Sequence, residues 1–429
     1  MKKTISLILA FLMLIALFTG CSTEPEKKEE TKTESTATTD TAASDVTLKF
    51  IRIGNDAAEG DYWKGLIDSF NKANDGITVE YDEAAIGEAM ETKLNTAFAA
   101  GLGQDIIGHG IMSVAARVEA GHYMDISSYF NKWEGKEDIM PSVLANGTYN
   151  GKTYGLAYST TPFVFAYRTD LFEKAGLDPN TPPTTWDELK EYAIKLTEKD
   201  GEKITVAGFA FPMTSGNFVE FDIFAFGNGS LYYDDEGNPT IDTPEKAEAF
   251  EFLQSFLPDV NLPYNSNEVN PFLNGNAAMT LINNVALTPM LNNEEYKGKV
   301  AIATPPTNGT DADFCGCNML FIGGNCKNPD EAFSFIETAL TKKEVLNRAK
   351  VLAIPVTRSS QVDAFIELDP MNEVRARCVE IGIGMPRTTW AASFQKIRNE
   401  MVQQVLYSKA GAAEALASAQ SQLEAEIAG

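Results

Sequence analysis

The sequence predicts an α/β protein whose folded body has two lobes and follows an N-terminal signal and a linker. Three observations support this prediction. Strand-type alternation and helix-type spacing of apolar residues follow one another along the chain. The body from about Asp45 to Gly429 spans about 385 residues, which exceeds what one hydrophobic core usually holds. Hydrophobic residues make up 44% of the chain, which is enough to fill two cores.

The N-terminal residues have the pattern of a secretory signal. A basic "MKK" start precedes an apolar run to Phe18, which is too short for a comfortable membrane span. Cys21 follows Thr19-Gly20, and "LFTGC" resembles the lipobox of bacterial lipoproteins, in which the signal is cleaved and the cysteine carries lipid. We predict a signal peptide at 1–20 and lipidation of Cys21. The alternative is an ordinary signal peptide with an incidental cysteine.

The segment after the signal predicts a tether. Between Ser22 and Ser44 the chain is mostly Thr, Glu, Lys, Ser and Ala, without an aromatic residue. Such a stretch cannot bury enough apolar surface to offset its ordering entropy. We therefore predict that residues 21–45 are a lipidated cysteine followed by a disordered linker. About 23 residues of this kind have a root-mean-square reach of roughly 25 Å.

Charge and cysteine spacing exclude several functions. The net charge of −25 is opposite to the basic face that nucleic-acid binding requires, and it makes an anionic ligand less natural. Without Cys21, four cysteines remain, and three of them lie in "CGCNMLFIGGNC". That is not a zinc spacing, and the chain has only two histidines. We therefore expect no metal and no cofactor, and we interpret these thiols as buried, free or paired.

The first part of the body predicts alternating strands and helices. "VTLKFIRI" and "ITVEY" alternate like strands, and "QDIIGHG" contains a short buried strand. Between them, Trp63, Leu66, Ile67 and Phe70 have the spacing of a helix face. Met90 and the apolar residues that follow it mark a second helix. The order strand, helix, strand, helix, strand predicts a parallel sheet with helices on its faces.

The second part shows clear helix starts. Thr185 with Glu188 three residues later forms a capping box, after the strand-rich "TYGLAYSTTPFVFAYRTDLF". "ITVAGFAF" predicts another strand. Pro244 and Pro329 stand at the first position of two further helices. From Trp390 onward the residues are strong helix formers, so we predict helix to the end of the chain.

In this order the segments resemble the family 1 extracellular solute-binding proteins of bacterial ABC importers. The resemblance rests on "VTLKFIRIGND", "DYWKGLIDSFNKANDGITVEY", "KLNTAFAAGLGQDIIGHG" and, most specifically, "YNGKTYGLAYSTTPFVFAYRTDLFEKAGLDPNTPPTTWDELKEYAIKL". "FLNGNAAMTLIN", "KNPDEAFSFIETALT" and "LAIPVTRSS" follow in the same order. Gln104 and Arg168 replace the Pro and Asn that are usual in the family.

This resemblance implies a type II periplasmic-binding-protein-like fold, with two α/β lobes joined by a multi-strand hinge. We expect the chain to cross between lobes near Tyr158–Thr161, Thr304–Pro306 and Ala353–Pro355. Lobe one would comprise residues 46–158 with 306–352, and lobe two residues 159–304 with 353–429. Such proteins close on a ligand held between the lobes. The implied partners are a carbohydrate, the ABC permease subunits and the membrane through the lipid anchor, with no nucleic acid, and we expect a monomer.

Many members of the family bind sugars, whose hydroxyl groups suit carboxylates and amides and whose C–H faces suit aromatic rings. We therefore searched the loops that follow predicted strands, and the hinge. The ligand contacts expected on this basis are Asn55, Asp56, Glu83, His109, Tyr158, Ser159, Asn217, Phe218, Asn283, Asn284, Asn318, Arg387 and Trp390.

Structural interpretations compete with these assignments. Asn55-Asp56 is also plain turn chemistry. Asp105 is expected to be structural, as are Trp63 and Trp186. The Asn-rich stretch between 261 and 293 is expected to consist mostly of solvated turns.

Three other functions remain open from the sequence. A lipid-anchored hydrolase is one, although the chain has no Gly-x-Ser-x-Gly, no His-Glu-x-x-His and no P-loop. A carboxylate pair for glycoside hydrolysis assembles only in space, so sequence does not test it. The same fold with a polyamine or an anion is the second alternative, and an adhesin-like surface protein is the third. The predicted function is a substrate-capturing binding protein without enzymatic activity.

Overall fold

The computed structural model describes residues 45–54, 56–85, 87–214, 218–257, 259–265 and 267–428. The predicted signal peptide, Cys21 and nearly all of the predicted linker lie outside these residues, as do Asn55 and Asn217. Among the helices in the described part of the chain, none is long and apolar enough to cross a membrane.

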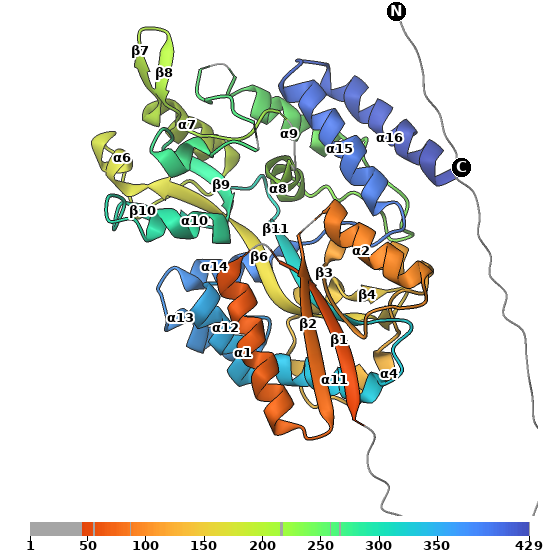
Figure 1. Cartoon of the computed structure of the whole chain (residues 1–429). Coiled ribbons are helices and arrows are strands. Elements are labelled where there is room, and N and C mark those ends of the chain that lie inside the picture. Colours follow the sequence, from red (N-terminus) through yellow and green to blue (C-terminus); the bar gives the residue numbers. More distant parts are fainter. Residues whose placement is uncertain are drawn as a thin grey trace, which may run out of the picture. The chain divides into compact units, whose positions relative to one another are not determined.

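A mixed sheet forms the centre of the described fold (Figure 1). Within the described residues it has eight strands, in the order β10-β6-β11-β3-β1-β2, with β12 beside β11 and β9 beside β6. β1 runs parallel to β2 and β3, whereas β11 is antiparallel to β3 and β6. The strands are β1 (Val46–Ile53), β2 (Ile77–Ala84), β3 (Ile106–Gly110), β6 (Gly155–Arg168), β9 (Met279–Asn283), β10 (Val300–Ala303), β11 (Asp313–Ile322) and β12 (Gly382–Ile383).

The N-terminal order of strand, helix, strand, helix, strand is confirmed. It runs β1, α1 (Ala57–Ala73), β2, α2 (Glu88–Ala99) and β3. The predicted face of α1 is buried, and Trp63 packs edge-on against Phe50 of β1 and Tyr158 of β6. Phe335 of α11 (Pro329–Ala339) closes the other side of this cluster. This apolar packing holds β1 and β6 against α1 and α11.

Strand β6 changes partners along its length, at the place where the first crossing between lobes is predicted. Its first half pairs with β11, and its second half pairs with β9 and β10. The register with β11 shifts between Asn318 and Met319, which leaves Tyr158 as the extra residue of a bulge. Arg348, fully buried in α12 (Lys342–Leu352), donates from Nη1 to the Tyr158 carbonyl at 2.6 Å. The buried guanidinium thus satisfies a carbonyl at the irregular point of the strand.

The predicted helix starts are also observed. Thr185 caps α7 (Trp186–Leu196), and Glu188 completes the capping box. α9 (Pro244–Gln254) and α11 both begin with proline. One prediction needs correction. Only Ile204 to Val206 of "ITVAGFAF" lie in a named strand, because the remainder joins the sheet through single bridges at Ala207 and Ala210.

The C-terminal region is helical, as predicted, and it consists of two helices. α15 (Ala391–Leu406) and α16 (Ala412–Ala428) are separated by residues 407–411. Lys409 adopts a positive φ of 56° there, and Gly411 follows, so the helix cannot continue. The turn lets α16 fold back beside α15 (Figure 1).

The remaining elements surround these. The other helices are α3 (Val114–Glu119), α4 (Ser127–Lys132), α5 (Pro141–Ala145), α6 (Thr169–Lys174), α8 (Val219–Gly227), α10 (Asn284–Leu291), α13 (Val362–Ile366) and α14 (Asn372–Glu380). Short 3-10 turns are η1 (Ile111–Ser113), η2 (Lys136–Asp138), η3 (Pro271–Asn274) and η4 (Ser359–Gln361). Two small hairpins pair β4 (Thr148–Tyr149) with β5 (Lys152–Thr153) and β7 (Glu198–Asp200) with β8 (Lys203–Val206).

Candidate functional site

A cavity of about 690 Å³ opens at the carboxyl ends of β1 and β3, and we call it the strand-end cavity. Ile53 and Gly110, the last residues of those two strands, line it together with residues of α2, η1 and α3. Its opposite wall is formed by Thr389, Ala392 and Gln395 at the start of α15. Ligands of open α/β sheets bind at this end of parallel strands, and clefts between lobes bury small molecules well.

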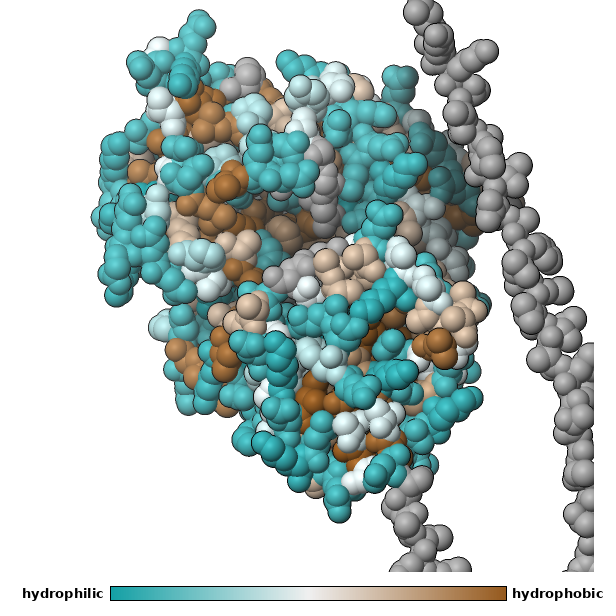
Figure 2. Space-filling model, viewed as in Figure 1, coloured by the Kyte–Doolittle hydropathy of each residue, from teal (hydrophilic) through white to brown (hydrophobic). Residues whose placement is uncertain are grey.

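The cavity therefore receives side chains from both predicted lobes. The face of the molecule in Figure 2 is hollowed across its middle, and hydrophobic residues gather along one edge of the hollow. The strand-end cavity is lined by polar side chains as well, which are Glu91, Asn95, Ser113, Arg117, His122, Asn318, Thr389 and Gln395. These supply both acceptors and donors, which a ligand with several hydroxyl groups requires.

Glu91 of α2 is the centre of a charged cluster in this cavity. Its Oε1 lies 3.0 Å from Nε2 of His109, and its Oε2 accepts from Nη2 of Arg117 at 2.5 Å. The hydrogen bond from His109, aided by the positive charge of Arg117, lowers the pKa of Glu91 to about 2. Because 43% of this side chain stays exposed, the ionised carboxylate remains available to a ligand.

His109 is the buried member of this cluster. It is 7% exposed, and its Nδ1 lies 2.8 Å from the Ser113 hydroxyl and 3.0 Å from the Tyr123 hydroxyl. Both hydroxyls are thus within hydrogen-bonding distance of Nδ1, while Nε2 of the same ring faces Glu91. His109 was predicted as a ligand contact. The structure places it next to Glu91, which lines the cavity, and its own contact with a ligand stays a prediction.

Arg117 of α3 joins the cluster to the neighbouring side chains. Its Nη2 also donates to Oδ1 of Asn95 at 3.3 Å, and its Nη1 donates to Nδ1 of His122 at 3.1 Å. Burial, and then the positive charge of Arg117, lower the pKa of His122. His122 stacks on Phe98 with ring centroids 4.1 Å apart. The result is a continuous polar surface along α2 and α3 that is fixed before a ligand arrives.

Among the predicted contacts, Asn318 lines the cavity directly, from β11 between Gly110 and Ser159. Asp56 is the N-cap of α1, where its carboxylate accepts from the Glu59 backbone N–H at 2.9 Å. Glu83 at the end of β2 is held by the buried Arg52, whose Nη2 donates to it at 2.7 Å. Asp56 and Glu83 thus already have structural bonds, and their predicted ligand role stays a prediction.

Other predicted residues lie in the protein interior. The side chains of Tyr158, Ser159 and Phe218 are buried, the first against Trp63. Asn284 is also buried, and its Nδ2 lies 3.3 Å from the Ala353 carbonyl. Their predicted contact with a ligand stays a prediction.

The last three predicted contacts lie at helix ends. Asn283 caps α10 by accepting from the Val285 N–H at 2.9 Å. Arg387 donates to the Ala145 carbonyl at 2.5 Å. Trp390, 9% exposed, packs edge-on against Phe394, while its neighbour Thr389 lines the cavity. The predicted ligand contacts of Asn283, Arg387 and Trp390 stay predictions.

Sequence reasoning missed most of the side chains that line the cavity. Glu91 and Asn95 stand one turn apart on α2, and Arg117 and His122 lie after β3. A charged helix face usually faces water, so nothing in the local pattern separated Glu91 from its exposed neighbours Glu88 and Lys93. The spacing of Glu91 and Asn95, which places both on one face, was the signal present.

The described residues contain no cluster of His, Cys, Asp or Glu that would hold a metal ion. Cys315, Cys317, Cys326 and Cys378 are free and buried. Burial raises the pKa of Cys326 to about 12, so this thiol stays protonated. The structure thus agrees with buried thiols in the reduced form.

Fold and cavity together define a two-lobed binding protein. Residues 54–345 match the family model of bacterial extracellular solute-binding proteins, and the chain belongs to that family. A binding protein of Brucella abortus is 27% identical over 67% of this chain and 70% of its own length.

Solved structures share the fold. The sugar-binding protein MalE of Xanthomonas citri superimposes with a TM-score of 0.80 at 19% identity, covering 89% of this chain and 98% of that one. An ABC transporter solute-binding protein of Thermotoga lettingae, bound with α-D-tagatose, gives a TM-score of 0.74 at 23% identity, covering 88% and 98%. The predicted two-lobed fold of the periplasmic-binding-protein type is confirmed.

Proposed function

We propose that this protein captures a carbohydrate in the strand-end cavity and delivers it to the permease of an ABC importer. The observation that carries the proposal is the cavity itself, which lies at the ends of parallel strands and has polar side chains on walls from both predicted lobes. Membership of the solute-binding family supports capture and delivery. The sugar ligands of the two structural neighbours support the ligand class.

The chemistry of the cavity suits neutral hydroxyl groups. The carboxylate of Glu91 accepts, whereas the amides of Asn95, Asn318 and Gln395 both donate and accept. Glu91 is already paired with Arg117 and His109, so the cluster presents fixed dipoles with little net charge. Such a surface favours a polyol over a strongly charged solute.

The same cluster supports binding without turnover. Glycoside hydrolysis requires two carboxyl groups, one of them protonated to serve as the acid. Among the described residues that line the cavity, Glu91 is the only carboxylate, and its pKa of about 2 keeps it ionised. A general acid at this position is therefore not supported.

The N-terminal segment lies outside the described residues, and its role rests on the sequence. We propose that the signal at 1–20 is cleaved and that lipid on Cys21 anchors the protein at the outer face of the cell membrane. Confinement near the permease raises the effective concentration of the captured solute there. A single acyl chain holds weakly, so a lasting tether needs more than one.

A thermal-shift screen against a panel of mono- and oligosaccharides tests the ligand class. A ligand at 100 times its dissociation constant stabilises the folded state by about 2.7 kcal/mol, which gives a measurable rise in Tm. We expect at least one sugar to raise the Tm. If a polyamine or an anion raises the Tm and no sugar does, the proposed carbohydrate ligand is wrong and the protein binds another class of solute.

Two further measurements complete the test. Chromatography of each sugar after incubation with the protein should recover it unchanged, and any product would contradict a binding-only role. Fractionation of cells that express Cys21→Ser should show the protein released from the membrane. If the variant stays in the membrane fraction, the lipid anchor is wrong.

A further inference from the structure

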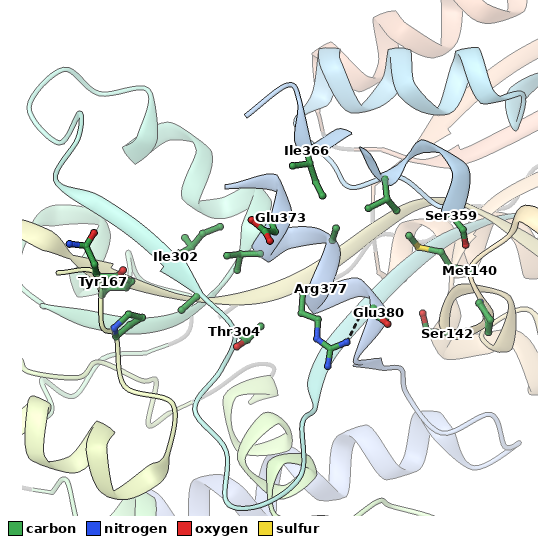
Figure 3. Close-up of a pocket in the computed structure, with 17 residues that line it drawn as sticks. Met140, Ser142, Tyr167, Ile302, Thr304, Ser359, Ile366, Glu373, Arg377 and Glu380 are labelled. Atoms are coloured by element: carbon green, nitrogen blue, oxygen red, sulfur yellow. Dashed lines mark hydrogen bonds and ion pairs between the residues drawn. The ribbon is translucent and has the colours of Figure 1, made fainter. Parts of the chain in front are cut away.

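A second cavity, of about 940 Å³, lies alongside α14, and we call it the α14 cavity (Figure 3). Its walls come from α14, from Ile302 to Thr304 at the end of β10, from Ile366 of α13 and from Met140 at the start of α5. Among the described residues, it shares no lining residue with the strand-end cavity. It is therefore a separate site on the molecule.

Apolar side chains make up most of this lining. Ile302 of β10 and Val374 of α14 lie on one side, and Val362 and Ile366 of α13 border the same space. Ile302 is buried, whereas Val362, Ile366 and Val374 are only partly buried, so an apolar group placed among these three would cover hydrophobic area now open to water. A ligand with an aromatic or branched apolar part suits such a wall.

The charges around the α14 cavity are predominantly negative. Glu373, Glu380 and Arg377 line it, and Arg377 is bonded to both Glu380 (2.7 Å) and Asp311. The single cation of the lining is thus matched by two carboxylates. Within the described part of the chain, the exposed carboxylate of Glu373 has no ion pair, and Figure 3 shows it beside Ile302.

We propose that the α14 cavity is a second binding site that takes a small organic cation with an aromatic or branched apolar group. The apolar group packs on Ile302 and Val374, and the ammonium group lies at the carboxylate of Glu373. An anion of the same shape would meet unpaired negative charge, and a neutral compound would lose the ionic contact. The overall charge of −25 favours the approach of a cation further.

This cavity is also next to a predicted crossing between the lobes. Thr304, which lines it, begins the predicted crossing at Thr304–Pro306, and Met140 belongs to the predicted first lobe. A molecule in the α14 cavity would therefore contact both predicted lobes. A solute in the strand-end cavity that changes the arrangement of the lobes would change the affinity of the α14 cavity for its ligand. By linkage, the ligand of the α14 cavity would change the affinity for that solute by the same factor.

Three matched probes test the proposal by ligand-observed NMR and calorimetry on the purified protein: 2-phenylethylammonium, 2-phenylethanol and phenylacetate. We expect the cation to bind with a dissociation constant of about 1 mM, which is the weak affinity of a small fragment. We expect the neutral and anionic probes to bind at least about threefold more weakly. No binding of the cation up to about 10 mM, or equal binding of all three, would overturn the proposal.

Variants locate the site. Glu373→Gln should weaken binding of the cation by about threefold to fivefold. Glu367 is an exposed carboxylate outside the lining, so Glu367→Gln should leave the affinity for the cation unchanged. Val374→Lys should abolish binding of the cation, with its fold checked by circular dichroism. Glu91→Gln in the strand-end cavity should have no effect. Equal losses in Glu373→Gln and Glu367→Gln, or a loss in Glu91→Gln, would place the cation elsewhere.

Discussion

Two arginine–carboxylate pairs in this protein lie in opposite surroundings. Arg117 and Glu91 form one at the strand-end cavity, where 43% of the Glu91 side chain is exposed. Arg398 and Asp222 form the other between α15 and α8, where the two side chains are 0% and 1% exposed. The same two chemical groups therefore meet once beside water and once in the protein interior.

The pKa values of the two carboxyl groups move in opposite directions. The bond from His109, with Arg117 beside it, lowers the pKa of Glu91. Burial raises the pKa of Asp222, although Arg398 and the Tyr232 hydroxyl, which donates at 2.6 Å, oppose that shift. At the cavity the hydrogen bond from His109, together with charge attraction, outweighs desolvation, whereas desolvation dominates inside. The first pair is suited to meet a ligand, and the second holds two helices together.

The largest effect is expected when the interior pair is broken on one side. Arg398→Met leaves Asp222 as a buried carboxylate without its cation, so the free energy of unfolding should fall by about 3–5 kcal/mol. Urea denaturation at neutral pH measures this.

The double variant Asp222→Asn with Arg398→Met is the matched control. It removes both charges, so it should be more stable than Arg398→Met alone. A single variant as stable as the native protein would show that this pair does not hold α8 and α15 together.

The interior pair also shows where sequence reasoning ends. The helices α7, α9 and α11 were predicted from caps and apolar spacing, which are local signals a few residues long. Asp222 and Arg398 are 176 residues apart in the sequence. Neither helix, taken by itself, contains a signal that its charged residue has a buried partner. Their pairing exists only after the chain has folded, so no window of sequence contains it.

The candidate site follows the same rule. Its location at the strand ends was predictable, because the order of strands and helices fixes which ends carry loops. Asn318 was predicted from the family resemblance, and it lines the cavity from within β11. Glu91 was not, since its partners His109 and Arg117 come from other elements. Asp56 and Asn283 illustrate the opposite difficulty. Both cap helices, and residues at turns and caps are of the same types as residues that contact ligands, so sequence alone does not separate the two roles.

The cavity pair should matter less for stability and more for ligand affinity. With the sugar that gives the largest thermal shift, Glu91→Gln should weaken binding by about tenfold or more, because a charge-assisted hydrogen bond to the ligand is lost. Calorimetry measures this. Glu88→Gln is the control, because Glu88 is an exposed carboxylate of the same helix that does not line the cavity, and this variant should bind as the native protein does.

An unchanged affinity in Glu91→Gln would remove the carboxylate from the site. If Glu91→Gln instead loses several kcal/mol of folding stability, the Glu91–Arg117 pair has a structural role like that of Asp222 and Arg398. The proposed difference between the cavity pair and the interior pair would then be wrong.

Acid should separate the two carboxyl groups. The folded-state pKa of Glu91 lies below its ordinary value of 4.5, so its stabilising contribution is complete above that pH and is lost as the pH falls towards about 2. Since this side chain is partly exposed, the loss should stay below about 1 kcal/mol. The raised pKa of Asp222 has the opposite sign, because its burial favours the protonated form and costs stability as the pH rises.

Urea denaturation at several pH values between about 7 and 3, on the native protein and on Glu91→Gln, measures the difference. The two curves should converge as the pH falls. A constant gap across this range would show that Glu91 does not titrate with a lowered pKa.

The smallest effect is expected for an ion pair on the exposed surface of a helix. Lys195 and Glu191 lie 2.7 Å apart at i, i+4 on α7, with side chains 48% and 62% exposed. A double-variant cycle with Glu191→Gln and Lys195→Met should give a coupling energy of about 0.3–0.5 kcal/mol, which salt screens almost completely. A coupling above about 1 kcal/mol, or one that persists in roughly 1 M salt, would show that exposure alone does not rank these pairs. A small, salt-sensitive value would extend the trend from the interior through the cavity to the surface.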